Sequence, residues 1–347
     1  MTERVLSRRD AIRGLSGAAT AGITGLAGCN ALGGGGGTDE LTVAYMPIYP
    51  DMQHFVMQEE GYFDGIDAEI DAKEFTDGPS IVQAYASGEI DVGLFGVVPA
   101  MIVIDRGIAA KVAAANITEP MMLMARDDFM PLWEDHGADA FAEFEEREGR
   151  TFTFGTFPEG SVPDILLRYW LIDEQGLTPG EDVEVIGMGG ANAVRQGLAT
   201  DEIDGTSIME PVPTLTAESG DPYQPLAIAP EFMPGQPAAV VLMNDEVRDS
   251  DVGEQFVEQH VRATEFINSE PDATARHAST VIGEETLSVE TAREALDSPI
   301  SNFVSDPRAI ENGAEIFTEY AAELGKTDER LSLDQVFDYS LYDSVTE

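Results

Sequence analysis

Hydrophobic and polar positions follow two alternating patterns from about residue 41 onward. Short apolar or alternating runs predict strands at 41–47, 68–75, 91–96, 110–117, 120–126, 151–156, 182–188, 204–209 and 236–244. Between them, apolar residues three or four positions apart predict helices, for example at 52–63 and 165–177. Strands and helices in this order favour mostly parallel sheets joined by right-handed crossovers.

This strand–helix pattern occurs twice, before and after an acidic stretch at 127–150. We therefore expect an α/β protein with two lobes, like a type II periplasmic-binding-protein fold. Lobe 1 would comprise 39–126 and 240–347, including C-terminal helices, and lobe 2 would comprise 127–239. The chain would cross between the lobes near Met124 and near Pro237, and these crossings would act as hinges. Ligands prefer such interfaces and the carboxyl ends of parallel strands.

A short motif is repeated in the two predicted lobes. It reads ASGEIDVGLFG at 86–96 and ATDEIDGTSIMEP at 199–211. Each Ile-Asp pair stands where a helix returns to a strand, and a short acid there can hydrogen-bond the local backbone. We therefore predict structural roles for Asp91 and Asp204.

The N-terminal segment has the features of an export signal. Arg8 and Arg9 precede an apolar run at 15–28 that is too short to span a bilayer. The run ends in LAGC, which resembles the lipobox of exported lipoproteins, and Cys29 is the only cysteine. We expect residues 1–28 to be a twin-arginine lipoprotein signal and 29–38 a glycine-rich tether. Lipidated Cys29 would hold the protein on the outer face of the cell membrane.

The charge balance narrows the possible partners. The chain has 19 Lys and Arg residues against 65 Asp and Glu residues, a formal net charge of −46. Nucleic acid is excluded as a partner because phosphate binding needs clustered basic residues. The acids are spread along the whole chain, which is typical of a salt-adapted, halophilic surface. The alternative interpretation is an acidic site for a cation.

Motifs for cofactor chemistry are absent from the sequence. The four histidines are scattered and there is one cysteine, so we expect no metal and no cofactor. GMGGAN at 187–192 imitates a dinucleotide-binding loop but has Asn192 in place of its third glycine. Asn116 begins a glycosylation sequon, although it adjoins a predicted buried strand.

Residues 75–102 resemble the first-lobe signature of the substrate-binding proteins of ABC importers. The branch is the one that handles nitrate, sulfonates, taurine and thiamine precursors. The matching positions are Phe75, Gly78, Pro79, Gly88, Ile90, Asp91, Gly93, Gly96 and Pro99. The second lobe matches more loosely, through the 155–188 segment and the Glu210-Pro211 pair, and the similarity covers about residues 40–245. Sulfonate-binding members often carry an aromatic residue where this chain has Met209.

The resemblance implies a monomeric extracytoplasmic protein that closes two lobes on a small anionic or zwitterionic solute, or on a thiamine-precursor pyrimidine. It would deliver the solute to a permease and its ATPase. Two alternatives stay open. One is a biosynthetic enzyme on the same fold, from a thiamine-pyrimidine or menaquinone pathway, and the other is a cell-surface interaction module.

The candidate ligand-binding residues lie at predicted strand ends and helix starts. Free N–H groups at helix starts favour an anionic group, although ordinary helix capping is the alternative. Carboxylates there would repel a pure anion and suit a zwitterion or a cationic ring. The tyrosines would flank the ligand or pack between lobes. The predicted set is Tyr45, Tyr49, Asp51, Gly78, Pro79, Ser80, Gly96, Val97, Thr156, Ser161, Val162, Gly190, Asn192, Met209 and Glu210.

Overall fold

The computed structural model describes residues 40–347. The predicted signal segment 1–28, the predicted lipidation site Cys29 and the predicted tether 29–38 therefore lie outside the described residues. Within 40–347, none of the helices combines the length and apolar character that a membrane span requires.

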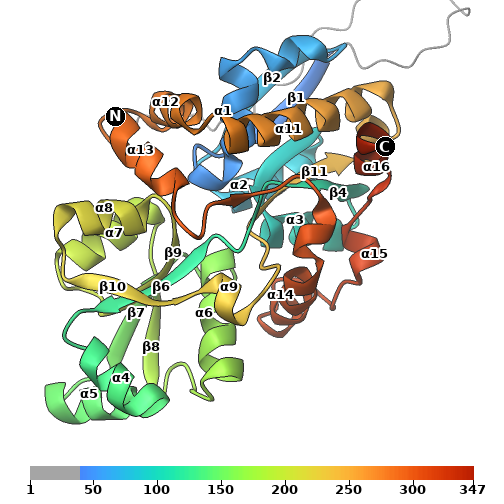
Figure 1. The fold of residues 1–347 in the computed structure, drawn as a ribbon. Coiled ribbons are helices and arrows are strands. Elements are labelled where there is room, and N and C mark those ends of the chain that lie inside the picture. Colours follow the sequence, from blue (N-terminus) through green and yellow to red (C-terminus); the bar gives the residue numbers. More distant parts are fainter. Residues whose placement is uncertain (1–39) are drawn as a thin grey trace, which may run out of the picture. The chain divides into compact units, whose positions relative to one another are not determined.

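The first sheet, which we use to define lobe 1, has the strand order β2-β1-β3-β11-β4 (Figure 1). Strands β1, β2 and β3 are parallel, and β11 is antiparallel to both of its neighbours. The elements are β1 (Glu40–Tyr45), η1 (Tyr49–Asp51), α1 (Met52–Glu59), η2 (Tyr62–Gly65), β2 (Glu69–Glu74), α2 (Gly78–Ser87), β3 (Val92–Gly96), α3 (Val97–Asp105), β4 (Ala110–Ala115) and β11 (Ala239–Asn244).

The second sheet, which defines lobe 2, has the order β10-β6-β9-β7-β8. Strands β7, β8 and β9 are parallel, and β6 is antiparallel to both β9 and β10. The elements are β6 (Met121–Arg126), α4 (Met130–His136), η3 (Gly137–Asp139), α5 (Ala140–Glu148), β7 (Phe152–Thr156), α6 (Val162–Tyr169), η4 (Trp170–Glu174), β8 (Val183–Gly187), α7 (Ala191–Ala199), β9 (Gly205–Met209), α8 (Val212–Ser219) and β10 (Tyr223–Ile228).

The two sheets have matching topologies. The order β2-β1-β3-β11-β4 corresponds place by place to β8-β7-β9-β6-β10. In each sheet the antiparallel member, β11 or β6, is the first sheet strand after a crossing between the lobes. The predicted two-lobed α/β fold with mostly parallel sheets is confirmed. The sequence had placed 120–126 in lobe 1, but β6 pairs in the second sheet, so the first crossing lies at 116–120.

Both crossings are short segments outside the two five-stranded sheets. The first contains β5 (Ile117–Thr118), which pairs with β12 (Asn302–Phe303) of the C-terminal region. The second, at 229–238, contains α9 (Ala229–Phe232) and Pro237, near which the crossing was predicted. A hinge needs a few loop or element-end residues that can absorb changes in backbone angles. Both crossings contain such residues around β5 and α9.

The C-terminal region is mostly helical, as predicted. Helix α11 packs on α1, α14 packs on α3 and on α6, and α13 packs on α12 and on α8. These helices thus contact both lobes. The elements are α10 (Asp245–Arg248), α11 (Asp251–Ser269), α12 (Pro271–Ile282), α13 (Val289–Leu296), η5 (Pro307–Ile310), α14 (Glu311–Glu323), α15 (Leu333–Val336) and α16 (Ser340–Thr346).

An aromatic core holds the helices α4 to α6 against the second sheet. Phe129 lies with its ring centroid 4.6 Å from that of Phe152 and 5.0 Å from that of Phe141. Phe154 and Trp170 complete the cluster. All of these rings are buried, and burying each contributes about 1.5–3 kcal/mol. The core fixes α6, and with it the loop between β7 and α6.

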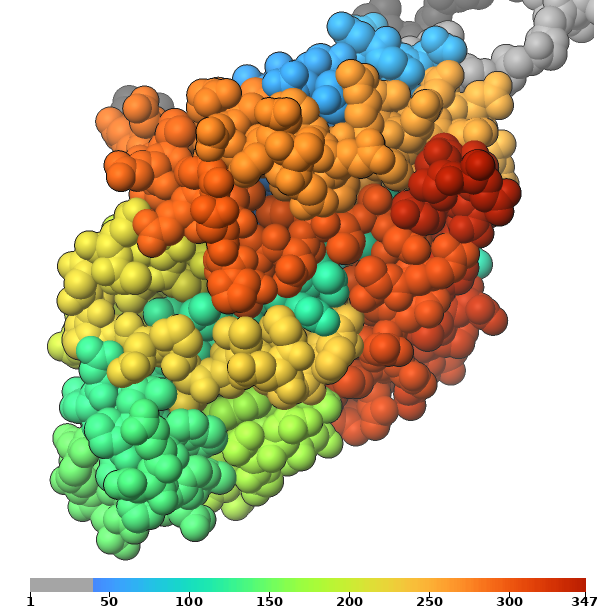
Figure 2. Space-filling model, in the orientation of Figure 1, coloured from blue at the N-terminus to red at the C-terminus, as the bar shows by residue number. Residues whose placement is uncertain are grey.

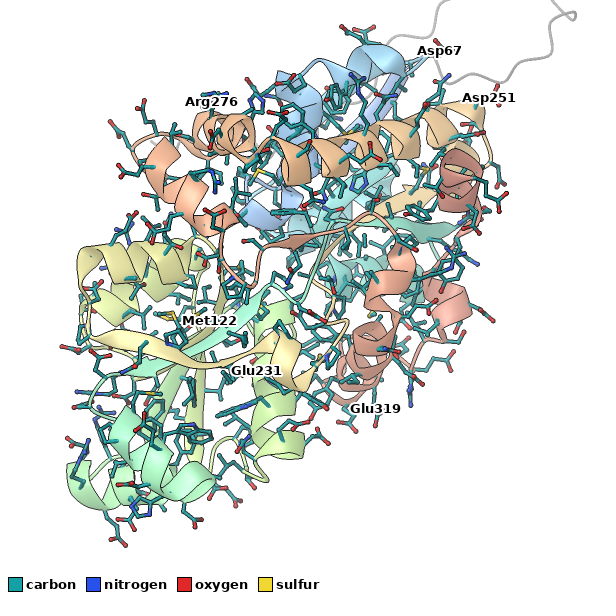
Figure 3. All side chains as sticks on the ribbon, in the orientation of Figure 1. Asp67, Met122, Glu231, Asp251, Arg276 and Glu319 are labelled. Carbon is teal, nitrogen blue, oxygen red and sulfur yellow. The ribbon has the colours of Figure 1, made fainter. Side chains whose placement is uncertain are left out.

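The acidic side chains are distributed over the described surface. Asp67, Glu231, Asp251 and Glu319 are all exposed and come from different elements of the fold (Figure 3). This distribution agrees with the even spread of acids along the sequence.

Candidate functional site

Six loops at the carboxyl ends of parallel strands form the candidate site. They are 46–51, 75–77 and 96–97 in lobe 1, and 157–161, 188–190 and 210–211 in lobe 2. A Cβ atom built on Gly96 would lie 3.8 Å from Cγ2 of Val162, so the two sets of loops meet across the lobes. Every predicted site residue lies on these loops, at the end of the preceding strand or in the first turn of the following helix. Ligand binding by these residues stays a prediction.

In lobe 1, backbone donors at two helix starts are already used. The Asp77 carboxylate accepts the N–H of Ser80 at 2.8 Å, and Pro79 has no N–H to offer. The N–H of Val97 donates to the main-chain oxygen of Ala238 at 2.7 Å. The starts of α2 and α3 therefore keep few free donors for an anion, and at α2 the capping interpretation describes the contacts.

Gly78 allows the two helices of lobe 1 to approach each other. A Cβ atom at this position would lie 2.5 Å from Cγ of Pro99 in α3. Real Cβ atoms do not make contacts this short, so the close packing of α2 on α3 depends on glycine here. Gly78 directly follows the 75–77 loop, and Pro99 lies in the first turn of α3, just after the 96–97 loop.

In lobe 2, the start of α6 carries its own acid. The N–H of Ser161 donates to the oxygen of Pro158 at 3.0 Å, while its buried Oγ has no partner among the described residues. Asp164 in the first turn accepts the N–H of Gly160 at 2.8 Å and pairs with Arg168 at 2.9 Å. Asp164 thus occupies the position that favours an anion at a helix start.

The start of α7 is open by comparison. Space surrounds Gly189 and Gly190, where an added Cβ would meet no atom within 4 Å. Gly190 has a φ of +118°, which favours glycine, and Asn192 is exposed. This corner can accept a solute group without displacing a side chain.

Glu210 is a buried carboxylate at the end of β9. It is 4% exposed and follows Met209, which is also buried. Burial raises the pKa of Glu210, and hydrogen bonds from Ser298 and Thr214 offset part of that rise. The Thr214 N–H lies 3.2 Å from its Oε2. The peptide bond from Glu210 to Pro211 is cis.

Tyr49 of lobe 1 lies near Glu210 of lobe 2. The tyrosine is 2% exposed, and its hydroxyl lies 3.1 Å from Oγ of Ser301. Burial raises the pKa of Tyr49 strongly; Ser301 opposes the rise and the Glu210 carboxylate adds to it. Ser298 and Ser301 come from the segment between α13 and β12. The sequence gives no sign of them, because Tyr49 and Ser301 are 252 positions apart and no local pattern connects them.

Tyr45 lies against a histidine of its own lobe. Its ring stacks on His54 of α1 with centroids 3.9 Å apart and planes 18° apart. Its hydroxyl lies 3.5 Å from Oε2 of Glu74. His54 is fully buried, and burial lowers its pKa to about 3. The neutral imidazole therefore acts as an aromatic surface for Tyr45.

Asp51 joins the first loop to the first crossing. It is fully buried and accepts the Asn116 side-chain amide at 3.0 Å and the Met46 N–H at 3.3 Å. Burial raises the pKa of Asp51 to about 8, although both hydrogen bonds oppose the rise. Asn116 is itself fully buried and lies 3.1 Å from Nε2 of His260. Its amide is therefore not available for glycosylation in the folded protein.

The six loops carry negative charge and no basic residue. They contain four carboxyl groups, Asp51, Asp77, Glu159 and Glu210, and no Lys or Arg. The negative charge comes from the other three, because the raised pKa of Asp51 keeps its carboxyl group mostly protonated at neutral pH. Among the described residues, the basic side chains that form ion pairs with these loops are Lys326 and Arg168, and both pair with Glu159. Residues 40–347 hold no group of three or more His, Cys, Asp or Glu that could bind a metal ion. The site therefore suits a solute with a positive or hydrogen-bond-donating group.

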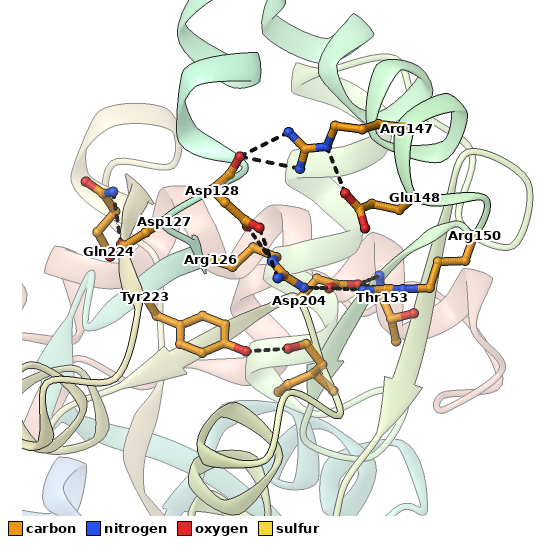
Figure 4. A network of polar contacts seen from close by, with 11 residues as sticks. Arg126, Asp127, Asp128, Arg147, Glu148, Arg150, Thr153, Asp204, Tyr223 and Gln224 are labelled. Atoms are coloured by element: carbon orange, nitrogen blue, oxygen red, sulfur yellow. Dashed lines mark hydrogen bonds and ion pairs between the residues drawn. The ribbon is translucent and has the colours of Figure 1, made fainter.

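The repeated aspartates lie at the amino ends of β3 and β9, the ends opposite to the six loops. Asp91 accepts the N–H of Thr42 at 2.9 Å, and Asp204 accepts the N–H of Thr153 at 3.0 Å (Figure 4 shows Asp204). Both stand just before the first residue of a strand, away from the strand-end loops. Both residues have structural roles, but each carboxylate binds the backbone of a neighbouring strand, and the predicted bond to the local backbone was wrong.

A surface hollow of about 530 Å³ lies elsewhere on lobe 1. It follows η2 and β2 and is lined by residues that include Phe63, Ile66, Glu69 and Ile70. It shares no residue with the six loops and is therefore separate from the candidate site.

The chain matches known proteins in sequence pattern and in fold. Residues 34–283 match the model of the NMT1-like family. A ligand-binding component of an ABC-type import system from Staphylococcus aureus has a TM-score of 0.69 at 17% identity, covering 89% of this chain and 99% of that one. The periplasmic nitrate-binding protein NrtA from Synechocystis PCC 6803 has a TM-score of 0.71 at 14% identity, with 89% and 88% covered.

A third solved structure has the same fold. The periplasmic aliphatic sulphonate binding protein SsuA from Escherichia coli has a TM-score of 0.68 at 14% identity, with 87% of this chain and 92% of that chain covered. A search of curated protein sequences gave no match. The matched family region spans well over half of the chain, and this protein belongs to the NMT1-like family.

Proposed function

We propose that this protein is the extracytoplasmic solute-binding component of an ABC importer. Its role is to capture a small solute between two lobes and deliver it to a permease, without chemical change. The observation that carries the proposal is that strand-end loops of two topologically matching lobes face each other, at Gly96 and Val162 and at Tyr49 and Glu210. The two short crossings supply the hinges. Solved structures of the same fold are described as ligand-, nitrate- and sulphonate-binding proteins, which supports a transport role.

The charges of the loops favour a zwitterion or an amine-bearing heterocycle over a free inorganic anion. Glu210 is buried and its charge acts on Tyr49 across the lobes, and no loop supplies a Lys or Arg. A buried carboxylate repels an anion but is well placed to accept hydrogen bonds from a solute amine. The open start of α7 at Gly190 is then the part of the site that suits a sulfonate or carboxylate group.

A matched pair of solutes tests this proposal. Taurine and ethanesulfonate share a sulfonate group, and only taurine carries an amine. The temperature of thermal unfolding should rise when taurine or an aminopyrimidine is added. It should stay unchanged with ethanesulfonate or nitrate. A solute at 100 times its Kd stabilises the folded protein by about 2.7 kcal/mol. If ethanesulfonate and taurine stabilise equally, the amine preference is wrong. If no solute of the panel binds by calorimetry, the transport proposal loses its support.

Two variants locate the binding group. Glu210→Gln should raise the Kd for the stabilising amine solute by about 10- to 100-fold, because a hydrogen bond to a charged group contributes about 1.5–3 kcal/mol. Glu184→Gln removes one exposed carboxylate from β8, outside the six loops, and should leave the Kd unchanged. Equal Kd values for both variants would contradict a role for Glu210 in binding.

Attachment to the membrane through Cys29 is the remaining part of the proposal. A lipid on this residue would keep the solute-loaded protein beside its permease. Intact-mass measurement of protein from the membrane fraction should show a lipid adduct that Cys29→Ser lacks. Recovery of the unmodified chain from that fraction would contradict lipidation.

A further inference from the structure

The helix α14 connects lobe 1 to a loop of the candidate site in lobe 2. On its lobe 1 side, α14 packs on α3, and the N–H of Asp328 beyond it donates to Asp105 at the end of α3 at 2.9 Å. The N–H of Gly313 donates to the oxygen of Gly235 in the second crossing at 3.2 Å. These contacts attach α14 to lobe 1 and to the hinge.

On its other side, the segment just after α14 reaches the loop between β7 and α6. Nζ of Lys326 lies 3.0 Å from Oε1 of Glu159. The aliphatic part of Lys326 lies on Gly160, where an added Cβ would come within 2.3–2.8 Å of three of its carbon atoms. Glycine at position 160 therefore allows the lysine to cross directly over the loop. Arg168, 3.8 Å from Glu159, adds a second positive charge from lobe 2.

Within α14 itself, Tyr320 makes a second contact with lobe 2. Its hydroxyl donates to Asp173 of η4, and its ring lies edge-on to Tyr169 at 6.3 Å between centroids. The contacts from α14 to lobe 2 thus combine an ion pair, a hydrogen bond and ring packing.

We propose that Lys326 and Tyr320 form a latch that holds the β7–α6 loop in the closed position. This inference rests on the proposed lobe closure. When lobe 2 rotates about the two crossings, the β7–α6 loop moves with it, while α14 stays with lobe 1. The Lys326–Glu159 and Tyr320–Asp173 contacts then exist only in the closed form. Contacts made in one state alone shift the population toward that state.

The latch also positions part of the candidate site. Glu159 and Gly160 directly precede Ser161 and Val162, and Val162 faces Gly96 of lobe 1. Holding Glu159 and Gly160 therefore holds the start of α6 against lobe 1.

A second contact between the C-terminal helices and lobe 2 lies away from the latch. There α13 reaches α8 through a hydrogen bond from the Thr291 hydroxyl to the Glu218 carboxylate at 2.9 Å. On the face drawn in Figure 2, the orange C-terminal segment lies against the yellow segment of lobe 2.

Distance measurements without added solute test the latch. Nitroxide labels at Glu89→Cys in lobe 1 and Glu181→Cys in lobe 2, both exposed positions, report lobe separation in a full-length Cys29→Ser background. In double electron–electron resonance, Lys326→Gln should increase the ratio of open to closed molecules by about 2- to 5-fold, as expected for an exposed ion pair. The charge swap Glu159→Lys with Lys326→Glu should restore the original ratio.

Arg330→Gln is the matched control. Arg330 pairs with Glu315 and Glu319 of α14 itself, so this variant loses one positive charge without losing a contact between lobes. Salt also screens repulsion between the acidic lobes, so variants are compared at the same salt concentration. The latch is wrong if Lys326→Gln leaves the ratio unchanged or if Arg330→Gln shifts it equally. Failure of the solute panel would contradict the transport proposal but leave this result interpretable.

Discussion

At matching places in the two sheets, Asp91 and Asp204 join neighbouring strands through the same backbone bonds. The N–H of Asp91 donates to the oxygen of Thr42 at 3.0 Å, and that of Asp204 to the oxygen of Thr153 at 2.8 Å. Each carboxylate then accepts the N–H of the same threonine. The main-chain oxygen of each aspartate accepts an N–H from the last residue of the antiparallel strand. This donor is Asn244 in lobe 1 and Arg126 in lobe 2.

The two lobes differ in what completes this arrangement. In lobe 1, the second carboxylate oxygen of Asp91 accepts the neutral amide of Asn244 at 3.1 Å. In lobe 2, Asp204 is 1% exposed and accepts Arg126 at 2.9 Å and Arg150 at 2.6 Å. Burial would raise the pKa of Asp204, but bonds from Arg150, the Thr153 N–H and Arg126 hold it below its ordinary value. The strand connection thus needs only an acceptor, and lobe 2 adds charge pairing to it.

Lobe 1 has its own fully buried acid, Asp51, which has no positively charged partner among residues 40–347. Its donors are neutral groups, Asn116 and the Met46 N–H, and its pKa is raised to about 8. The buried acid of lobe 1 is therefore held in its protonated form at neutral pH, whereas that of lobe 2 is held ionised. Acidification should act on the two lobes in opposite directions.

The largest expected effect is on the pH dependence of stability. Folded Asp51 keeps a proton that the unfolded chain releases near pH 4, so its contribution to stability falls as the pH rises from about 4 to 8 and then levels off. The limit for one proton is about 1.4 kcal/mol per pH unit. Asp51→Asn should remove this fall, as measured by urea unfolding at pH 5, 6.5 and 8. Parallel curves for the variant and the unaltered protein would contradict the assignment.

The second effect compares the repeated aspartates directly. Asp204→Asn should lower the free energy of unfolding by about 2–3 kcal/mol, less than for a fully buried pair because Arg126 and Arg150 are partly exposed. Asp91→Asn should cost about 1 kcal/mol, the value of an ordinary hydrogen bond. Urea unfolding followed by circular dichroism measures both. Equal losses would show that the arginines add nothing to the shared backbone bonds.

The Asp204 contribution should also disappear in acid. Its lowered pKa means that the stabilisation is present above about pH 4 and is lost as the pH falls through the folded-state pKa. The gap in urea midpoint between Asp204→Asn and the unaltered protein should therefore narrow below pH 4. A gap that stays constant from pH 7 to pH 3 would rule out an ionised Asp204 as its source.

The smallest effect concerns glycines at the site-facing loops that follow the corresponding strands β2 and β8. Gly78→Ala should destabilise by about 1–2 kcal/mol, because the new Cβ collides with Pro99. Gly189→Ala in lobe 2 projects into open space and should stay within about 0.5 kcal/mol of the unaltered protein. Thermal unfolding measures both changes. Similar melting temperatures would mean that α2 can move away from α3 at little cost.

The sequence was sufficient to predict two lobes with mostly parallel sheets, because strand and helix periods differ and loops separate them. It did not indicate the sheet to which Met121–Arg126 belongs. The apolar residues of a strand indicate that it is buried, but they do not indicate which strands it pairs with. The positions of Ser298 and Ser301 beside the site were also beyond local patterns, since contacts over such separations depend on the folded chain.

The candidate site was also only partly predictable from the sequence. Strand ends and helix starts could be located from residue types, and all predicted positions do lie there. The partners of those residues could not be predicted. Asp77 uses Ser80 as an ordinary cap, Tyr45 stacks on His54, and Asp51 bonds to the first crossing. Each of these partners competes with a ligand for the same polar or aromatic group.

The placement of β6 and β11 also sets the order in which the lobes can be completed during synthesis. The sheet of lobe 2 uses strands from 121–228, which emerge as one continuous stretch. Lobe 1 begins first, but its strands β3 and β4 both pair with β11, which emerges only at Ala239–Asn244. Their apolar edges must stay unpaired while all of lobe 2 is made, a period in which open strand edges invite aggregation. The lobe that is translated first is therefore the one that finishes folding last.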